Sequence, residues 1–131
     1  MKKTALLHPA LSEMIASLGH QDMLVVADAG LPIPIETYRI DLALTRGVPG
    51  FVQTLQVILE EMQVERIILA EETGQKSPQI QEQIQKLLPG VAVEKVTHTR
   101  LKELTASARA VVRTGEFTPF ANVILVSGVV F

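Results

Sequence analysis

The sequence contains no cysteine and no tryptophan, and aromatic side chains make up only 4% of its 131 residues. The lack of cysteine excludes disulfides, thiolate nucleophiles and zinc sites built from cysteine. The scarcity of aromatic residues argues against nucleic-acid modules that stack bases on aromatic rings. The net charge of −2 offers no attraction to a phosphate backbone. We therefore expect no nucleic-acid partner.

Long hydrophobic runs are missing as well. Lys2 and Lys3 precede a short apolar stretch at 5–7, as they would in a signal peptide, but His8 and Pro9 interrupt it well before the length of an export signal. No stretch approaches the roughly 18–20 apolar residues of a membrane span. We therefore expect a soluble protein with no membrane partner, and the absence of cysteine is compatible with the cytosol.

Aliphatic side chains dominate what is present, since 47% of the residues are hydrophobic and the mean hydropathy is +0.29. Such a composition is typical of α/β proteins, whose parallel strands are buried on both faces. Helical spacing and the expected N-cap Ser77 predict helices over 9–18, 51–62, 78–88 and 100–108. Apolar runs and alternation predict strands over 23–27, 38–44, 67–70, 91–96, 110–112 and 123–126. The pattern predicts one α/β domain, residues 1–131, with an open, mostly parallel sheet and helices on both faces.

Polar residues that directly follow buried strands form the candidate site, because ligands in such sheets bind at the carboxyl ends of the strands. Asp28 follows the first strand, and its carboxylate either binds ligand hydroxyls, orients a histidine or caps backbone amides before Gly30. His98 follows the fourth strand and is either a second functional imidazole or an exposed residue at a helix start. Glu71 and Glu72 follow the third strand and could be paired acids, and of the two Glu71 is a candidate by position alone. The loop 113–122 is a candidate for the same reason.

His20 follows Gly19 at the end of the first predicted helix. Its imidazole is either a cation placed favourably at a helix C-terminus or a group that gives and takes a proton near neutral pH. Together with His8 and His98 it lacks the spacing of metal ligands, so we expect no metal. The segment 28–34 has one glycine and two prolines, which argues against a loop that binds the phosphates of NAD or ATP. We therefore expect neither NAD nor ATP to bind.

Two segments of the sequence carry a family resemblance. The run Val-Ala-Asp-Ala-Gly-Leu-Pro-Ile-Pro at 26–34, preceded by Gly-His at 19–20, resembles the N-terminal signature of the D-ribose pyranase family. The run Arg-Thr-Gly-Glu-Phe-Thr-Pro at 113–119, with Ala-Asn at 121–122, resembles the C-terminal signature. The second run favours the ribose branch over the related fucose mutarotases. The similarity spans nearly the whole chain.

The resemblance implies an open α/β fold that assembles as a decamer of two stacked pentamers. Members of the family interconvert the pyranose and furanose forms of D-ribose in the cytoplasm and use no cofactor. They are linked to ribose uptake and to ribokinase, which takes the furanose form.

The resemblance also implies roles for individual residues. The proton donor of the family falls on His20, and its ribose-binding positions fall on Asp28, His98, Phe120, Ala121 and Asn122. The family commonly has tyrosine where this chain has Phe120, so the ring is kept and its hydroxyl is lost.

Two other functions remain open beside the isomerase. One is a sugar-binding accessory protein without turnover, and the other is a mutarotase for another sugar such as L-fucose. His20 separates the first from an enzyme, because binding alone needs no titratable residue there.

The spacing of His20 and Asp28 carries an expectation about assembly. They flank the predicted strand 23–27, which in extended form carries the chain roughly 17 Å across the sheet. Because a hydrogen bond needs about 3 Å between heavy atoms, the two side chains should not meet within one subunit. We therefore expect His20 to reach the site from a neighbouring subunit.

Overall fold

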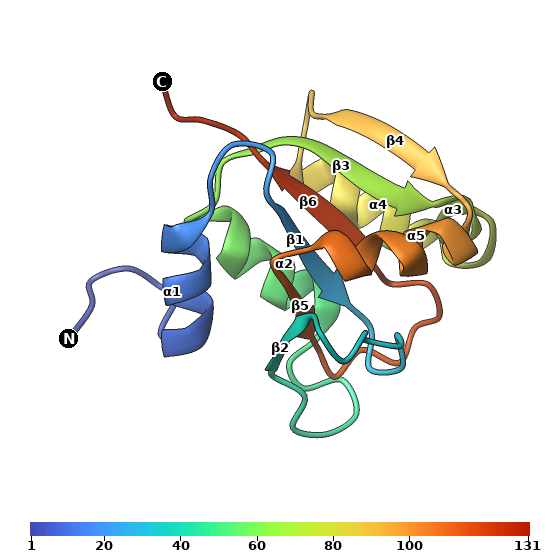
Figure 1. Cartoon of the computed structure of the whole chain (residues 1–131). Helices are drawn as coiled ribbons and strands as arrows, with labels where there is room; N and C mark the ends of the chain where they lie inside the picture. Colours follow the sequence, from blue (N-terminus) through green and yellow to red (C-terminus); the bar gives the residue numbers. More distant parts are fainter.

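A computed structural model covers residues 1–131 and contains a single six-stranded sheet with helices on both faces (Figure 1). The strands are β1 (Met23–Ala27), β2 (Tyr38–Asp41), β3 (Val64–Ala70), β4 (Ala92–Val96), β5 (Ala110–Arg113) and β6 (Val123–Ser127). The helices are α1 (Pro9–Ser17), α2 (Phe51–Leu59), α3 (Glu71–Lys76), α4 (Pro78–Leu87) and α5 (His98–Leu104), and a 3₁₀ turn covers Thr105–Ser107.

The strand order is β2-β5-β1-β6-β3-β4. Every neighbouring pair is parallel except the two that involve β6, which runs antiparallel to β1 and to β3. The expectation of an α/β fold with an open, mostly parallel sheet is therefore confirmed, and its one reversed strand lies in the middle of the sheet.

The hydrophobic core lies on both faces of the sheet because successive side chains of a strand point to opposite sides. On one face, Leu24 and Val26 of β1 pack in the larger cluster with buried side chains of α1, α2 and α4. On the other face, Val25 of β1 packs in a smaller cluster with Leu101 of α5. Both clusters are almost wholly aliphatic, as the composition predicts, and α5 lies in front of the sheet in Figure 1 with α2 and α4 behind it.

The reversed strand decides which residues meet. Val123, the first residue of β6, pairs with Val26 near the end of β1. The start of β6 therefore lies at the same edge of the sheet as the carboxyl ends of the parallel strands. Asn122 thus comes beside Asp28, although the two are 94 positions apart in the chain. His20 precedes β1 and lies toward the opposite edge.

Beyond shifts of element ends, the structure departs from the predicted elements at two places. The strand predicted over 38–44 ends at Asp41, because its only neighbour in the sheet, β5, ends at the paired residue Arg113. The chain then enters a loop in which Leu44 is 81% exposed. Helix α3, which the hydrophobic pattern does not predict, begins directly at the end of β3.

Candidate functional site

Asp28 is held firmly at the end of β1. Its backbone N–H donates to Oδ1 of Asn122 (2.9 Å), and its Oδ2 accepts from Nδ2 of Asn122 (3.0 Å). Its Oδ1 accepts from the Gly30 amide two residues on (2.9 Å), which is the local capping that a turn-forming aspartate makes. The carboxylate is only half-buried and lines two neighbouring cavities. The capping alternative is thus confirmed, and it leaves Asp28 fixed in place beside a cavity.

His98 and Phe120 form an aromatic pair next to Asp28. His98 is the first residue of α5, and its backbone N–H donates to both carboxylate oxygens of Glu72 (3.1 and 2.9 Å). Its ring meets that of Phe120 edge to face, with the centroids 5.0 Å apart and the planes at 87°. Nδ1 of His98 is buried and has no hydrogen-bond partner.

A cavity of about 230 Å³ lies beside this pair. Its lining residues are Asp28, Gly30, Leu31, Pro32, His98, Pro119 and Phe120. A carboxylate, an imidazole and an aromatic ring thus line one small space, which is the composition of a pocket for a small polar ligand with an apolar side.

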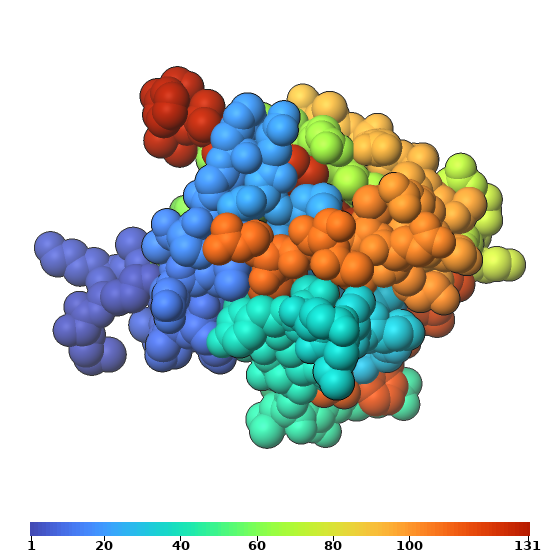
Figure 2. Space-filling model, viewed as in Figure 1, coloured from blue at the N-terminus to red at the C-terminus, as the bar shows by residue number.

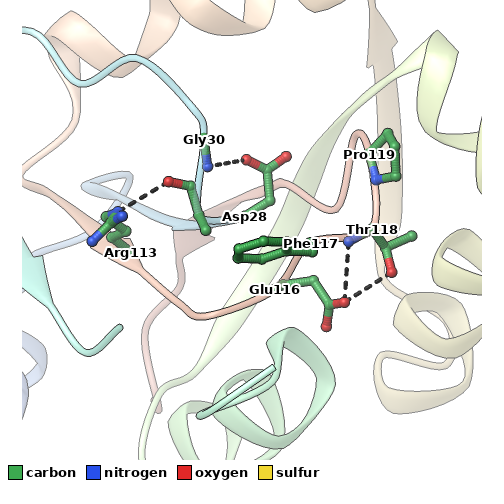
Figure 3. A pocket seen from close by; sticks show the side chains of 8 residues that line it. Asp28, Gly30, Arg113, Glu116, Phe117, Thr118 and Pro119 are labelled. Atoms are coloured by element: carbon green, nitrogen blue, oxygen red, sulfur yellow. Dashed lines mark hydrogen bonds between the residues drawn. The ribbon is translucent and has the colours of Figure 1, made fainter. Parts of the chain in front are cut away.

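A second cavity of about 380 Å³ shares Asp28, Gly30 and Pro119 with the first. In the view of Figure 3, the ring of Phe117 lies between Asp28 and Glu116. The Phe117 side chain is 58% exposed, and the Arg46 guanidinium stacks over it at 5.2 Å from the ring centroid.

Glu116 lines this second cavity, and several hydrogen bonds fix its carboxylate. Partial burial alone would raise the pKa of Glu116, but hydrogen bonds to its carboxylate from the backbone of Phe51, Phe117 and Thr118 and from the Thr118 hydroxyl outweigh burial and lower it. The carboxylate therefore stays ionised and ties the start of α2 to the loop before β6. Beside it, Nε of Arg113 donates to the Ala29 carbonyl.

The last two expected ribose-binding positions are wholly buried. Ala121 and Asn122 are both 0% exposed and line neither cavity. Both polar atoms of the Asn122 side chain bond to Asp28, and its backbone N–H donates to the Phe120 carbonyl (2.9 Å). The structure therefore shows Asn122 as the residue that positions Asp28 and Phe120. A direct contact between Asn122 and ribose stays a prediction.

His20 lies apart from this group. Its Nε2 is 2.8 Å from Oε2 of Glu65, and its side chain is 51% exposed. It lines a different cavity of about 480 Å³, bordered by the end of α1 and by residues 127–131. Figure 2 shows the C-terminal residues standing away from the body of the molecule. Within one chain His20 and Asp28 share no cavity and no hydrogen bond, as the length of β1 predicts.

Sequence reasoning named Glu72 only as one of two acids after a strand and Ser77 only as a helix cap. It missed Thr73 altogether, and it missed the contacts that all three make with the site. Ser77 occupies the expected N-cap position of α4, but its hydroxyl makes no capping bond. It donates instead to the Pro119 carbonyl (2.6 Å). Their partners lie 26, 47 and 42 positions further along the chain, so no local pattern could have identified them.

The structure groups no three His, Asp or Glu side chains as a metal site. None of its helices has the length and apolar character that crossing a membrane requires.

The fold and this site define an α/β protein with a small polar pocket at the carboxyl edge of its sheet. The model of the RbsD / FucU transport protein family matches residues 1–130. The chain belongs to this family.

Individual relatives agree over the full length. A D-ribose pyranase of Chloroflexus aggregans is 63% identical, and one of Symbiobacterium thermophilum is 53% identical, each over 100% of both chains. Among solved structures, Bacillus subtilis RbsD complexed with D-ribose has a TM-score of 0.97 and 44% identity over 100% of both chains. The fucose mutarotase of Streptococcus pneumoniae in complex with L-fucose has a TM-score of 0.78 and 25% identity, over 95% of this chain and 94% of that one.

Proposed function

We propose that this protein is a cofactor-independent isomerase that interconverts the pyranose and furanose forms of D-ribose. The observation that carries the proposal is the match in fold, over both full chains, to RbsD in complex with D-ribose, at a TM-score of 0.97. The D-ribose pyranases at 53–63% identity support the same activity. The fucose mutarotase is more distant in both sequence and fold, which favours ribose over L-fucose.

The chemistry needs only proton transfers. Opening a pyranose removes the proton of the anomeric hydroxyl and protonates the ring oxygen, and closure onto a different hydroxyl reverses both steps. General acid–base catalysis of this kind typically contributes about 10²–10⁴-fold. We assign the proton transfer to His20, whose imidazole works in both directions near neutral pH.

The contact with Glu65 favours one tautomer of the His20 imidazole. When Nε2–H of His20 donates to the Glu65 carboxylate, Nδ1 is left as the nitrogen that exchanges a proton with the sugar. Asp28 and His98 would bind ribose hydroxyls, and the ring of Phe120 would form an apolar wall. Ala121 and Asn122 would contribute further ribose contacts, as the family resemblance implies.

His20 and the other site residues lie in different cavities of one chain, so the proposed site is shared between subunits. His20 of one subunit would enter the Asp28 and His98 pocket of its neighbour, in the decamer of two pentamers that the family resemblance implies. Support comes from the exposed side chains of Val129, Val130 and Phe131, which border the His20 cavity and are 41%, 85% and 101% exposed. Apolar groups gathered in this way are typical of surfaces that a partner covers.

We further propose that the protein works in the cytoplasm, where ribose that has entered the cell meets the kinase that takes its furanose form.

Exchange NMR on D-ribose tests the function directly. Cross-peaks between pyranose and furanose resonances should grow faster with the protein than without it, and L-fucose under the same conditions should show a smaller acceleration. Binding of ribose without acceleration would identify a sugar-binding accessory protein. Acceleration for L-fucose alone would identify a mutarotase.

A further inference from the structure

The short helix α3 makes direct contacts with both segments that form the aromatic pair of the pocket. Glu72 accepts the backbone N–H of His98 with both oxygens. Thr73 Oγ1 donates to the Phe120 carbonyl (2.8 Å), and Ser77 Oγ, one residue past the helix, donates to the Pro119 carbonyl (2.6 Å). Thr73 is 0% exposed and Ser77 is 1% exposed, so water does not compete for either bond.

The backbone of Phe120 needs such support. Its φ of 62° is in the left-handed region, which a bulky aromatic residue rarely adopts. A conformation of this kind persists only where the surroundings hold it. The Phe120 carbonyl accepts from Thr73 Oγ1 and from the Asn122 amide (2.9 Å), so the direction of this peptide is fixed from two sides.

The ring of His98 is held only indirectly. Its Nδ1 has no hydrogen-bond partner. Its position therefore depends on where α5 begins and on the edge-to-face contact with Phe120. Glu72 fixes the start of α5, and its negative charge is also favourable at a helix N-terminus.

We infer that Glu72, Thr73 and Ser77 are positioning residues, which make α3 the element that sets the His98–Phe120 pair and with it the shape of the sugar pocket. The part of the inference that concerns ribose rests on the proposed function. The part that concerns the position of the His98–Phe120 pair rests on the structure alone. Since none of these bonds involves His20, the proposed acid–base group, losing one of them should weaken ribose binding and leave the proton transfer intact.

Thr73→Val tests the inference, because valine keeps the shape of threonine and removes only the hydroxyl. Thr54→Val is the matched control: Thr54 is 5% exposed, and its hydroxyl donates to the Gly50 carbonyl (2.8 Å) within α2. Thr73→Ser restores the hydroxyl. The readouts are the ring-proton NMR shifts of His98, assigned with His98→Gln, and the ribose concentration at half-maximal exchange together with the rate at saturation.

In Thr73→Val the His98 ring protons should shift, because the ring current of Phe120 acts on them at close range. The half-saturating ribose concentration should rise roughly two- to tenfold, the effect of one hydrogen bond, with the saturated rate and its pH profile unchanged. Thr54→Val and Thr73→Ser should resemble the wild type in every readout. If Thr73→Val does not fold, Ser77→Ala takes its place with the same expectations.

Unchanged His98 shifts and unchanged ribose dependence in Thr73→Val would overturn the inference, as would equal changes in Thr54→Val. The NMR shifts need no sugar. A wild-type protein that does not accelerate ribose exchange would therefore defeat the proposed function, while the shifts would still decide the role of α3.

Discussion

The two edges of the sheet are organised in opposite ways. At the carboxyl edge, Asp28 takes part in three hydrogen bonds, the Phe120 carbonyl accepts two, and their partner Asn122 is wholly buried. At the other edge, His20 is half exposed, and its side chain makes one polar contact, with Glu65. The first edge is preorganised within a single chain, as a binding site must be. Under the proposed shared site, the second edge would gain its function only when another copy of the chain completes it.

His20→Ala should have the largest effect on activity. Removing the imidazole should slow ribose exchange by about a hundredfold or more, because it removes the proposed acid–base group. The melting temperature should hardly change, since substitutions of exposed side chains usually alter the free energy of unfolding by less than about 0.5 kcal/mol. Exchange NMR and calorimetry measure the two. Gln85→Ala, also exposed but on α4, is the control and should be fully active, and a wild-type rate in His20→Ala would remove this residue from the mechanism.

Mixing two inactive variants tests whether the His20 and the Asp28 of one site come from different subunits. His20→Ala and Asp28→Asn would be dissociated, mixed in equal amounts and reassembled. If each site takes His20 from one subunit and Asp28 from the next, about a quarter of the sites should be intact and activity should return to that extent. Each variant carried through the same steps alone should stay inactive. Absence of recovery, with subunit mixing confirmed by mass spectrometry, would place both residues of a site in one chain.

Glu116→Gln tests how much the ionised carboxylate of Glu116 stabilises the carboxyl edge, through the pH dependence of the unfolding free energy. The folded-state pKa of Glu116 is lowered from 4.5, so its ionised form stabilises the folded state above pH 4.5 and this contribution is lost as the pH falls through the lower folded value. The wild type should therefore exceed Glu116→Gln in unfolding free energy at pH 7, by about 1 kcal/mol or less because solvent screens the carboxylate. The gap should narrow below pH 4.5.

Urea unfolding at several pH values measures that gap. Glu82→Gln is the control, because Glu82 forms only an exposed pair with Lys86 on α4. A gap between the wild type and Glu116→Gln that is constant with pH would show that the charge of Glu116 does not stabilise the loop.

Phe120→Tyr should have the smallest effect. If the ring serves as an apolar wall, adding the hydroxyl common in the family should change ribose affinity by less than about tenfold, or 1.4 kcal/mol. Isothermal titration with ribose measures it, and Phe117→Tyr, at an exposed ring outside the His98 cavity, is the control. A much larger gain would mean that the missing hydroxyl is a principal sugar contact.

The layout of the fold follows from local patterns, but the supports of the site do not. Apolar runs and helical spacing predict β1, β5, β6 and most helices, because each depends on neighbouring residues. These local patterns fail where the partner strand decides how long a strand is. This is the case for β2, which ends at Asp41 because its partner β5 ends there.

Within the site, Asp28 and His98 can be found because they follow strands, and the family resemblance adds His20 and residues 120–122. Glu72 also follows a strand, but its contact with His98 and the contact of Thr73 with Phe120 cannot be predicted in this way. Both contacts are hydrogen bonds to the backbone of distant residues, which have no sequence signature.

The central place of β6 has a consequence for synthesis. As a nascent chain leaves the ribosome, β2, β5 and β1 can join on one side and β3 and β4 on the other, but the strand between the two groups emerges last of the six. Until it is inserted, two incomplete sheets expose the edges of β1 and β3, a state that invites aggregation. Insertion of β6 then joins the sheet and brings Asn122 to Asp28 in one event, so only completely folded chains acquire the pocket.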